Sequence, residues 1–208
     1  MTLMAKVKQY RTPEALAAAL KARAANKVRL LGVDLGTNCG VAWADVVPKK
    51  PLCDATLFAG QLDLSVLPYE TGPLRFIRLK QFLSVLQPDA IGFEDVKYTP
   101  TVKNGGPIGV IMSRISKSAE LLGGLKVILA TWAEETEVPL QSLGIGQIKK
   151  YATNKGNAGK EAMIAAANER YGVNLDAKDY KSTGVDNLAD ALHICAMMIE
   201  GYTVGLST

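Results

Sequence analysis

The sequence is poor in cysteine and has no long hydrophobic run, and both absences exclude classes of protein. Its three cysteines, Cys39, Cys53 and Cys195, are widely spaced and form no CxxC pair, so they predict reduced thiols rather than a cysteine metal site. No segment approaches about 18 consecutive apolar residues, so no membrane-spanning helix is expected. Residues 1–11 are polar and lack the apolar segment of a secretory signal. Together these absences predict a cytoplasmic protein.

What the chain does contain is an ordinary globular composition with a small positive surplus. Of its 208 residues, 48% are hydrophobic and 21% are charged, which argues against disorder. The 24 Lys and Arg against 20 Asp and Glu give a net charge of +4, which permits a nucleic-acid partner without requiring one. No internal repeat or low-complexity linker divides the chain. We therefore expect one main domain.

The order of the expected elements predicts an α/β fold with a mixed central sheet flanked by helices. Strand-forming and helix-forming segments alternate after an early group of strands. The expected strands are 28–34, 39–43, 55–62, 89–94 and 138–143. The expected helices are 12–25, 73–87, 108–135 with a possible break at Gly123-Gly124, 145–151, 160–171 and 184–201. Residues 1–27 are predicted to be a helical extension, residues 28–208 the main domain, and 97–107 a loop.

Four acidic residues are candidates for a common site. Asp34 and Glu94 each end an expected strand, and Asp186 and Asp190 lie four residues apart in the last helix. That spacing puts both side chains on one helix face, and His193 falls on the same face. Each acid also has a simpler interpretation: a strand-end aspartate can cap a turn, and an acid near a helix start interacts favourably with the helix dipole.

Two acids on one helix face repel each other, and no cation is adjacent to them in sequence. A divalent metal would offset that repulsion, and Mg²⁺ prefers carboxylate oxygens. Two such ions about 4 Å apart can stabilise both the attacking and the leaving oxygen of a phosphodiester. Acids at two strand ends and on one helix face are what this mechanism requires.

The residues around these acids resemble the RuvC-type Holliday junction resolvases, especially the branch found in phages and prophages. The resemblance runs in order over about residues 28–200. It is carried by the segments LGVDLGT (31–37), GFEDV (92–96), IKKYATNKGNAGKEAM (148–163) and DNLADAL (186–192).

The resemblance implies an RNase H-like fold, a homodimer and cleavage that depends on two Mg²⁺ ions per site, with Mn²⁺ as a substitute. Asp34, Glu94 and Asp190 match three metal-binding catalytic acids of the family. Asp186 is the fourth candidate, although bacterial members place their paired acids three apart, where this chain has Asn187. Some relatives use a histidine on this helix, so His193 is a further catalytic candidate; the alternative is a half-buried helix residue.

Basic residues near these motifs are candidate DNA contacts. Lys155 and Lys160 match a basic stretch that approaches the scissile phosphate in the family, and Lys160 is assigned a catalytic role; a solvated surface position is the alternative for each. Residues 97–126 contain five basic residues and one acidic residue, and residues 145–181 contain seven and four. Lys97 and Lys103 are therefore predicted to contact DNA, and Tyr98 to stack on an unpaired base or else to pack on the surface.

Three functions remain open from the sequence. The first is a metal-dependent endodeoxyribonuclease that resolves four-way junctions and other branched DNA by paired nicks. The second is an ATP-binding protein of the actin and sugar-kinase type, because residues 34–38 also resemble the first phosphate loop of those proteins. That group needs two lobes and a second glycine-rich loop, for which this chain has no room. The third is a module that binds branched DNA without cutting it, against which the four acids argue.

Overall fold

A computed structural model describes residues 5–7, 17, 20, 25–47, 55–95, 108–178 and 180–205. Its centre is a mixed sheet of six strands in the order β1-β4-β3-β2-β5-β6. The strands are β1 (Ala5–Val7), β2 (Val28–Asp34), β3 (Asn38–Val46), β4 (Leu57–Asp63), β5 (Ala90–Glu94) and β6 (Leu140–Leu143). β3 pairs antiparallel with β2 and β4, whereas β2, β5 and β6 are parallel neighbours. The carboxyl ends of β2 and β5 therefore meet at one edge of the sheet.

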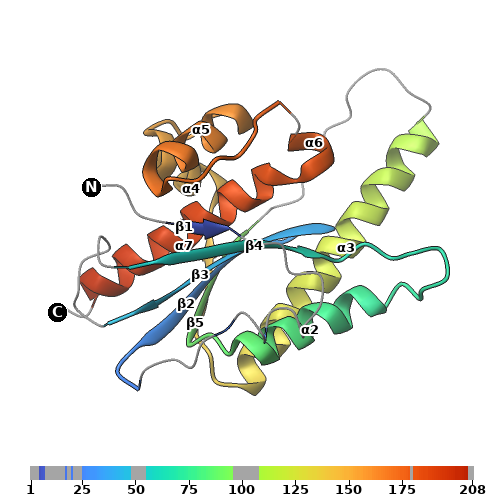
Figure 1. Ribbon diagram of the computed structural model, residues 1–208. Helices are drawn as coiled ribbons and strands as arrows, with labels where there is room; N and C mark the ends of the chain where they lie inside the picture. The colour runs from blue at the N-terminus through green and yellow to red at the C-terminus, as the bar shows by residue number, and fades with distance from the viewer. Residues whose placement is uncertain are drawn as a thin grey trace.

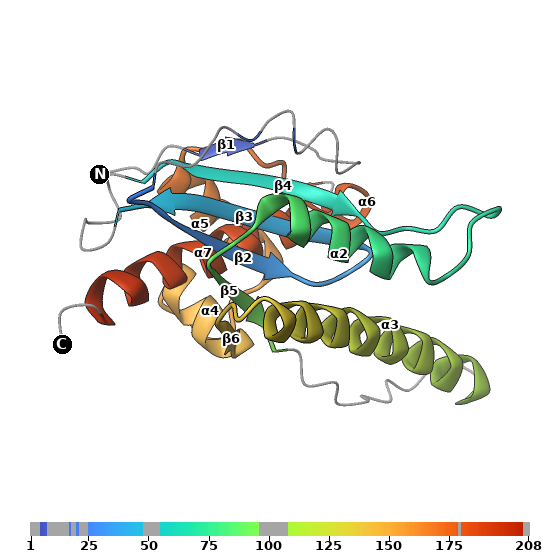
Figure 2. The same ribbon diagram turned by 90° about the horizontal axis from the view of Figure 1, so that it is seen from below.

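Helices cover both faces of the sheet, as Figures 1 and 2 show. They are α2 (Leu74–Leu86), α3 (Ile108–Glu135), α4 (Ile145–Thr153), α5 (Lys160–Tyr171), α6 (Tyr180–Thr183) and α7 (Val185–Gly205). One buried cluster packs α5 and α7 against the sheet, and a second packs α2 and α3 against its other face. The predicted α/β architecture is confirmed. In the described part of the chain, no helix is both long enough and apolar enough to cross a bilayer.

The structure differs from the prediction in two elements, and a third expected element is not tested. Residues Ala5–Val7 form a strand that pairs parallel with β4, so part of the predicted helical extension belongs to the sheet. Most of the expected helix 12–25 lies outside the described residues. α3 runs without a break through Gly123-Gly124, because glycine costs a helix only about 1 kcal/mol. A Cβ at Gly124 would lie 2.6 Å from the Phe76 ring, so this glycine allows α2 and α3 to pack closely.

Three glycines let α7 lie directly on the sheet. A Cβ at Gly32 would lie 2.6 Å from the backbone oxygen of Ala191, and one at Gly92 would lie 2.7 Å from the Met198 side chain. A Cβ at Gly40 would overlap the backbone of Asn187. Glycine in a strand interior marks such close approaches. The close packing brings the first turns of α7 to the edge where β2 and β5 end.

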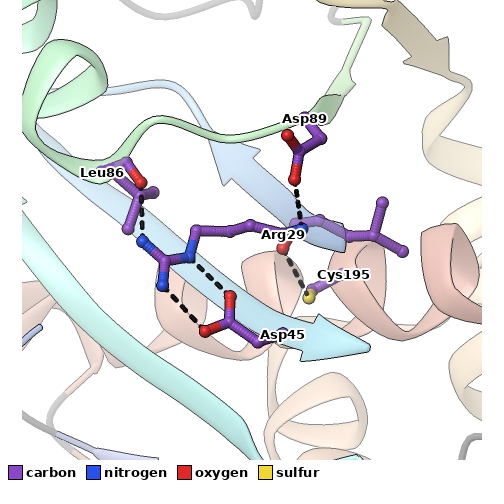
Figure 3. A network of polar contacts seen from close by, with 6 residues as sticks. Arg29, Asp45, Leu86, Asp89 and Cys195 are labelled. Carbon is purple, nitrogen blue, oxygen red and sulfur yellow. Dashed lines mark hydrogen bonds and ion pairs between the residues drawn. The ribbon is translucent and has the colours of Figure 1, made fainter. Parts of the chain in front are cut away.

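A buried arginine fixes the start of β2 against its neighbours (Figure 3). The Arg29 guanidinium donates two hydrogen bonds to Asp45 on β3, at 2.6 and 2.8 Å, and one of 2.8 Å to the backbone oxygen of Leu86. The Arg29 amide donates to Asp89 Oδ2 at 2.6 Å, and the Asp89 amide donates back to the Arg29 oxygen at 2.8 Å. These bonds tie the turn between α2 and β5 to β2. They help to set the register that brings Glu94 beside Asp34.

Candidate metal and nucleic-acid site

Three acids converge at the carboxyl edge of the sheet. Asp34 is the last residue of β2, Glu94 is the last residue of β5, and Asp190 lies in the second turn of α7. Each offers a carboxylate oxygen, and these oxygens all lie within 4.8 Å of one another. Asp34 and Glu94 are buried and Asp190 is half-buried. The strand-end and helix-face pattern of the sequence therefore corresponds to one real cluster.

The fourth acid, Asp186, has a different partner. It is buried in the first turn of α7 and forms an ion pair with Lys160, the first residue of α5. The Lys160 side chain is 58% exposed, and its Nζ also lies 5.3 Å from the centre of the Tyr180 ring on α6. Lys160 thus stands at the rim of the acidic cluster, between it and solvent.

Asn187 explains why the paired acids are four residues apart. Its side-chain amide donates a 2.6 Å hydrogen bond to the backbone oxygen of Asn38, the first residue of β3. This bond holds the start of α7 against the turn that follows Asp34. At the position three residues before Asp190, the chain therefore has a structural contact in place of a carboxylate. Asp186 is the acid that faces Lys160.

Burial and mutual repulsion make the cluster bind protons unusually tightly. Burial, followed by the charges of Asp190, Glu94 and Asp186, raises the pKa of Asp34 well above its usual value. Burial and the charges of Glu94 and Asp186 raise the pKa of Asp190 to about 7. Burial also raises the pKa of Glu94, and nearby lysines offset part of the increase. Such a cluster is stable with its carboxylates ionised only when positive charge is supplied.

Two lysines that the sequence interpretation did not select stand near the acids. The charge of Lys149 on α4 lowers the pKa of both Glu94 and Asp190, and that of Lys126 on α3 lowers the pKa of Glu94. Lys126 also forms a 2.7 Å ion pair with Asp95. Lys149 belongs to the segment that carries the family resemblance. The sequence signal was therefore present, but the pair Lys149-Lys150 does not reveal which member faces the acids.

His193, a predicted catalytic candidate, lies outside the acidic cluster in the structure. Helical spacing placed it on the face of Asp186 and Asp190, but α5 packs over α7 at this level. Its Nδ1 lies 2.8 Å from the Tyr171 hydroxyl, and its Nε2 lies 3.1 Å from the Met163 backbone oxygen. The ring has no solvent-exposed area, and burial lowers its pKa to about 4. His193 is therefore a neutral residue of the hydrophobic core next to the site.

The predicted DNA contacts are only partly within the described structure. Lys97, Tyr98 and Lys103 lie outside the described residues. Lys155 lies in the turn between α4 and α5, where its side chain is exposed and its amide donates a 3.3 Å hydrogen bond to the Thr153 hydroxyl oxygen. It lies in the same turn that leads to Lys160. Basic side chains from α3, α4 and α5 thus border the acids.

The donor set suits a hard divalent cation. Carboxylate oxygens are the ligands preferred by Mg²⁺ and Mn²⁺, whereas the described residues bring no histidine or cysteine to this cluster. Both described cysteines, Cys39 and Cys195, are buried and unbridged. The acids can hold positive charge, and the lysines around them can contact a phosphate.

No protein-family model matches the chain, and no match was found among curated proteins. Solved structures do match. RuvC of T. thermophilus in complex with a Holliday junction substrate aligns with a TM-score of 0.60 and 21% identity, over 86% of this chain and 96% of that one. A second T. thermophilus RuvC structure has a TM-score of 0.54 and 19% identity, over 87% and 98%.

The likeness extends to a eukaryotic protein. The yeast mitochondrial Holliday junction resolvase Ydc2 aligns with a TM-score of 0.52 and 15% identity, over 94% of this chain and 85% of that one. In all three cases the alignment covers most of both chains, so the whole domain is shared rather than one motif. The chain has the RNase H-like fold of the RuvC-type Holliday junction resolvases.

Proposed function

We propose that this protein is a metal-dependent, structure-selective endodeoxyribonuclease that resolves Holliday junctions and other branched DNA. The observation that carries the proposal is the convergence of Asp34, Glu94 and Asp190 at the edge of a RuvC-like sheet. Three carboxylates buried or half-buried beside one another cost stability unless they serve a ligand. The lysines around them fit a phosphate-bearing partner.

Asp34, Glu94 and Asp190 would hold Mg²⁺, with Mn²⁺ as a substitute. Asp186, which forms an ion pair with Lys160, is the fourth carboxylate that would be available to a second ion. A bound divalent cation supplies Lewis-acid stabilisation of the phosphate and lowers the pKa of coordinated water. The protein's own part is to hold the carboxylates close together and to position the phosphate between the acids and the lysines.

Lys160 and Lys149 are assigned to the phosphate that is cleaved. The charges of both lysines lower the pKa of Asp190, and the Lys160 side chain is exposed while Lys149 is half-buried. A positive side chain at this position stabilises the negative charge that develops in phosphodiester hydrolysis. Lys155, in the turn before Lys160, is assigned to a neighbouring phosphate. Lys97, Lys103 and Tyr98 stay predicted DNA contacts.

We further propose that the protein forms a homodimer, in which the two copies contact each other through the outer face of α3. Gly123, Val127 and Ala130 recur at helical spacing on the side of α3 that faces away from the sheet, and all three are exposed. The Val127 side chain is 62% exposed. These three positions carry small, uncharged side chains, which fits contact with a second copy of the same helix. Two copies would bring two acidic clusters to opposite strands of a junction.

The test is a cleavage assay on four-way, Y-shaped and linear duplex DNA of one sequence, with and without Mg²⁺. We expect Mg²⁺-dependent cleavage of the branched substrates and none of the linear duplex. Asp34→Asn and Glu94→Gln should each abolish cleavage while junction binding persists. Full cleavage by both purified variants would contradict the site, and equal cleavage of linear duplex would contradict the substrate class.

A further inference from the structure

The loop 64–73 lies at the same edge of the sheet as the acidic cluster. Because β2 and β4 both pair antiparallel with β3, they run in the same direction and end at the same edge. The loop 64–73 follows β4 there. In both views this loop and the N-terminal half of α3 extend beyond the sheet on one side of the molecule (Figures 1 and 2). The Leu64 amide donates a 2.8 Å hydrogen bond to the backbone oxygen of Thr37, in the turn after Asp34.

An ion pair between Arg78 and Glu70 holds the loop in shape, because both side chains also form hydrogen bonds with the loop backbone. Arg78 on α2 donates to Glu70 Oε1 at 2.5 Å and to the backbone oxygen of Ser65 at 2.6 Å. The other Glu70 oxygen accepts the Leu67 amide at 2.9 Å. The Glu70 amide in turn donates to the Leu67 oxygen at 2.9 Å. Both charged side chains are largely buried, so this arrangement is pre-organised rather than a solvated surface pair.

The ordered loop presents its apolar side chains outward. Tyr69 is 83% exposed and Leu67 is 45% exposed, on either side of Pro68. A loop fixed by a buried ion pair has no need of a large aromatic at its tip for its own stability. A Tyr side chain there offers a flat apolar ring with little conformational entropy to lose on binding.

An arginine at the base of the loop has an unusual environment. Arg75 lies in the first turn of α2, on the helix face shared by Leu79 and Phe82. Its Nε is buried and has no hydrogen-bond partner among the described residues. A buried guanidinium nitrogen without a partner is costly. Because Arg75 as a whole is only half-buried, a change of side-chain rotamer would bring this donor to an anion beside the loop.

We propose that loop 64–73 is a second DNA contact, in which Tyr69 stacks on a nucleobase exposed at the branch point and Arg75 contacts a nearby phosphate. The inference rests on the proposed function and adds to it a residue that senses the branch. Stacking on an aromatic ring is tolerant of sequence, as recognition of shape requires. One loop tip is far smaller than the roughly 800 Å² per partner that a stable dimer buries, so a nucleobase suits it better than a second copy of the chain.

The experiment uses Asp34→Asn as the parent, so that junction DNA is bound without being cut. A four-way junction carries 2-aminopurine beside the branch point, and both the affinity and the fluorescence change are measured. Tyr69→Ala should bind the junction about tenfold more weakly, the size of effect expected for one stacked base, and should lose the fluorescence change. Tyr69→Phe should keep both. Ile77→Ala, which removes an exposed apolar side chain from α2 outside the loop, should behave as the parent.

The outcomes separate this inference from the proposed function. A parent that does not prefer the junction to linear duplex overturns the proposed function, and the inference falls with it. If the parent prefers the junction, but Tyr69→Ala binds it with the same affinity and gives the same change in 2-aminopurine fluorescence, only the inference is overturned. The mass of each variant in solution is measured as well: a mass that changes in Tyr69→Ala assigns the loop to contact between copies and also overturns it.

Discussion

Asp190 and His193 lie three residues apart on α7, yet their surroundings give them opposite protonation behaviour. Asp190 lies in the open cluster of acids, where burial and repulsion raise its pKa to about 7. His193 lies one turn further along, beneath α5, where burial lowers its pKa to about 4. Helical spacing predicts which residues share a face, but it does not predict where a second helix begins to cover that face. For this reason the helical spacing that correctly places Asp190 in the cluster does not place His193 there.

His193 should therefore matter for stability and not for cleavage. In His193→Leu the Tyr171 hydroxyl and the Met163 oxygen lose their shared partner inside the core. A buried polar group without a partner costs about 1–3 kcal/mol, so the free energy of unfolding should fall by that amount. Mg²⁺-dependent cleavage per folded molecule should stay within about twofold of the parent, since the effect is confined to packing. Denaturant titration and junction-cleavage rates check the two parts. A rate loss of about a hundredfold at unchanged stability would return His193 to the site.

Asp190 should make the metal-free protein less stable as pH rises. Its folded pKa is about 7 against an ordinary value of 3.8, so the folded state keeps a proton that the unfolded chain has already released. This contribution is fully present at low pH and is lost as pH rises through about 7. Asp190→Asn removes the ionisation, so at pH 8 in EDTA the variant should be more stable by about 1–2 kcal/mol.

Melting temperatures measured against pH, with and without Mg²⁺, check this prediction. The difference between Asp190→Asn and the parent should disappear below pH 3.8, where Asp190 is protonated in the unfolded chain as well. Mg²⁺ should stabilise the parent more than the variant, because the carboxylate is a proposed ligand. A variant that is less stable than the parent at pH 8 without metal would show that the carboxylate is not strained in the folded protein.

At the scale of helices and strands, the elements that hold the site were those most accessible from the sequence. β2 and β5 were predicted as strands that end at Asp34 and Glu94, and the structure ends them there. Apolar runs bounded by a terminal acid carry that information locally. β1, with three residues, and α6, with four, carry too little pattern to be recognised, and β1 also depends on pairing with β4, which lies far along the chain. The close packing of α7 on the sheet also depends on glycines in the strands, and these lie too far from α7 in the sequence for a local pattern to predict the contact.

The short helix α4 gives the clearest prediction at this scale. Ile148 is its buried residue, and it packs in a small cluster with Met163 and Ile194. That anchor turns the half-buried Lys149 toward the acids and leaves Lys150 exposed. Lys149→Met should lower the cleavage rate at saturating junction by about 10–100-fold, because it removes a charge beside the phosphate. Lys150→Met, its matched neighbour, should change the rate by less than about threefold.

Single-turnover rates and junction affinities for both variants check this assignment. The loss in Lys149→Met should appear in the rate and not mainly in the affinity, because the charge acts where negative charge develops. Equal and small effects of the two substitutions would mean that Lys149 only lowers the repulsion among the acids. A larger effect at Lys150 would mean that α4 presents its other side to DNA.

At the scale of the whole molecule, the two faces of the sheet have different tasks. α4, α5 and α7 lie on one face and bring lysines and acids together at its edge, while α2 and α3 cover the other face. The net charge of +4 is small because basic and acidic residues are present in similar numbers. The acids form the cluster, and the lysines lie around it. α3 links both tasks, since Lys126 reaches toward the acids while Val127 faces outward.

The outward face of α3 leads to a prediction about the products of cleavage. Val127→Asp places a charge in the proposed contact between copies, and burying an unpaired charge is prohibitive, so the protein should become a monomer. Val127→Ile should stay a dimer. On a supercoiled plasmid that extrudes a cruciform, two coupled nicks give linear DNA, whereas a single nick gives an open circle. The monomer should therefore shift the product from linear to nicked DNA, while its acidic cluster still cleaves. Solution mass and gel analysis of the products check both steps. If Val127→Asp keeps the parent's mass and still linearises the plasmid, the contact between copies must lie on another surface.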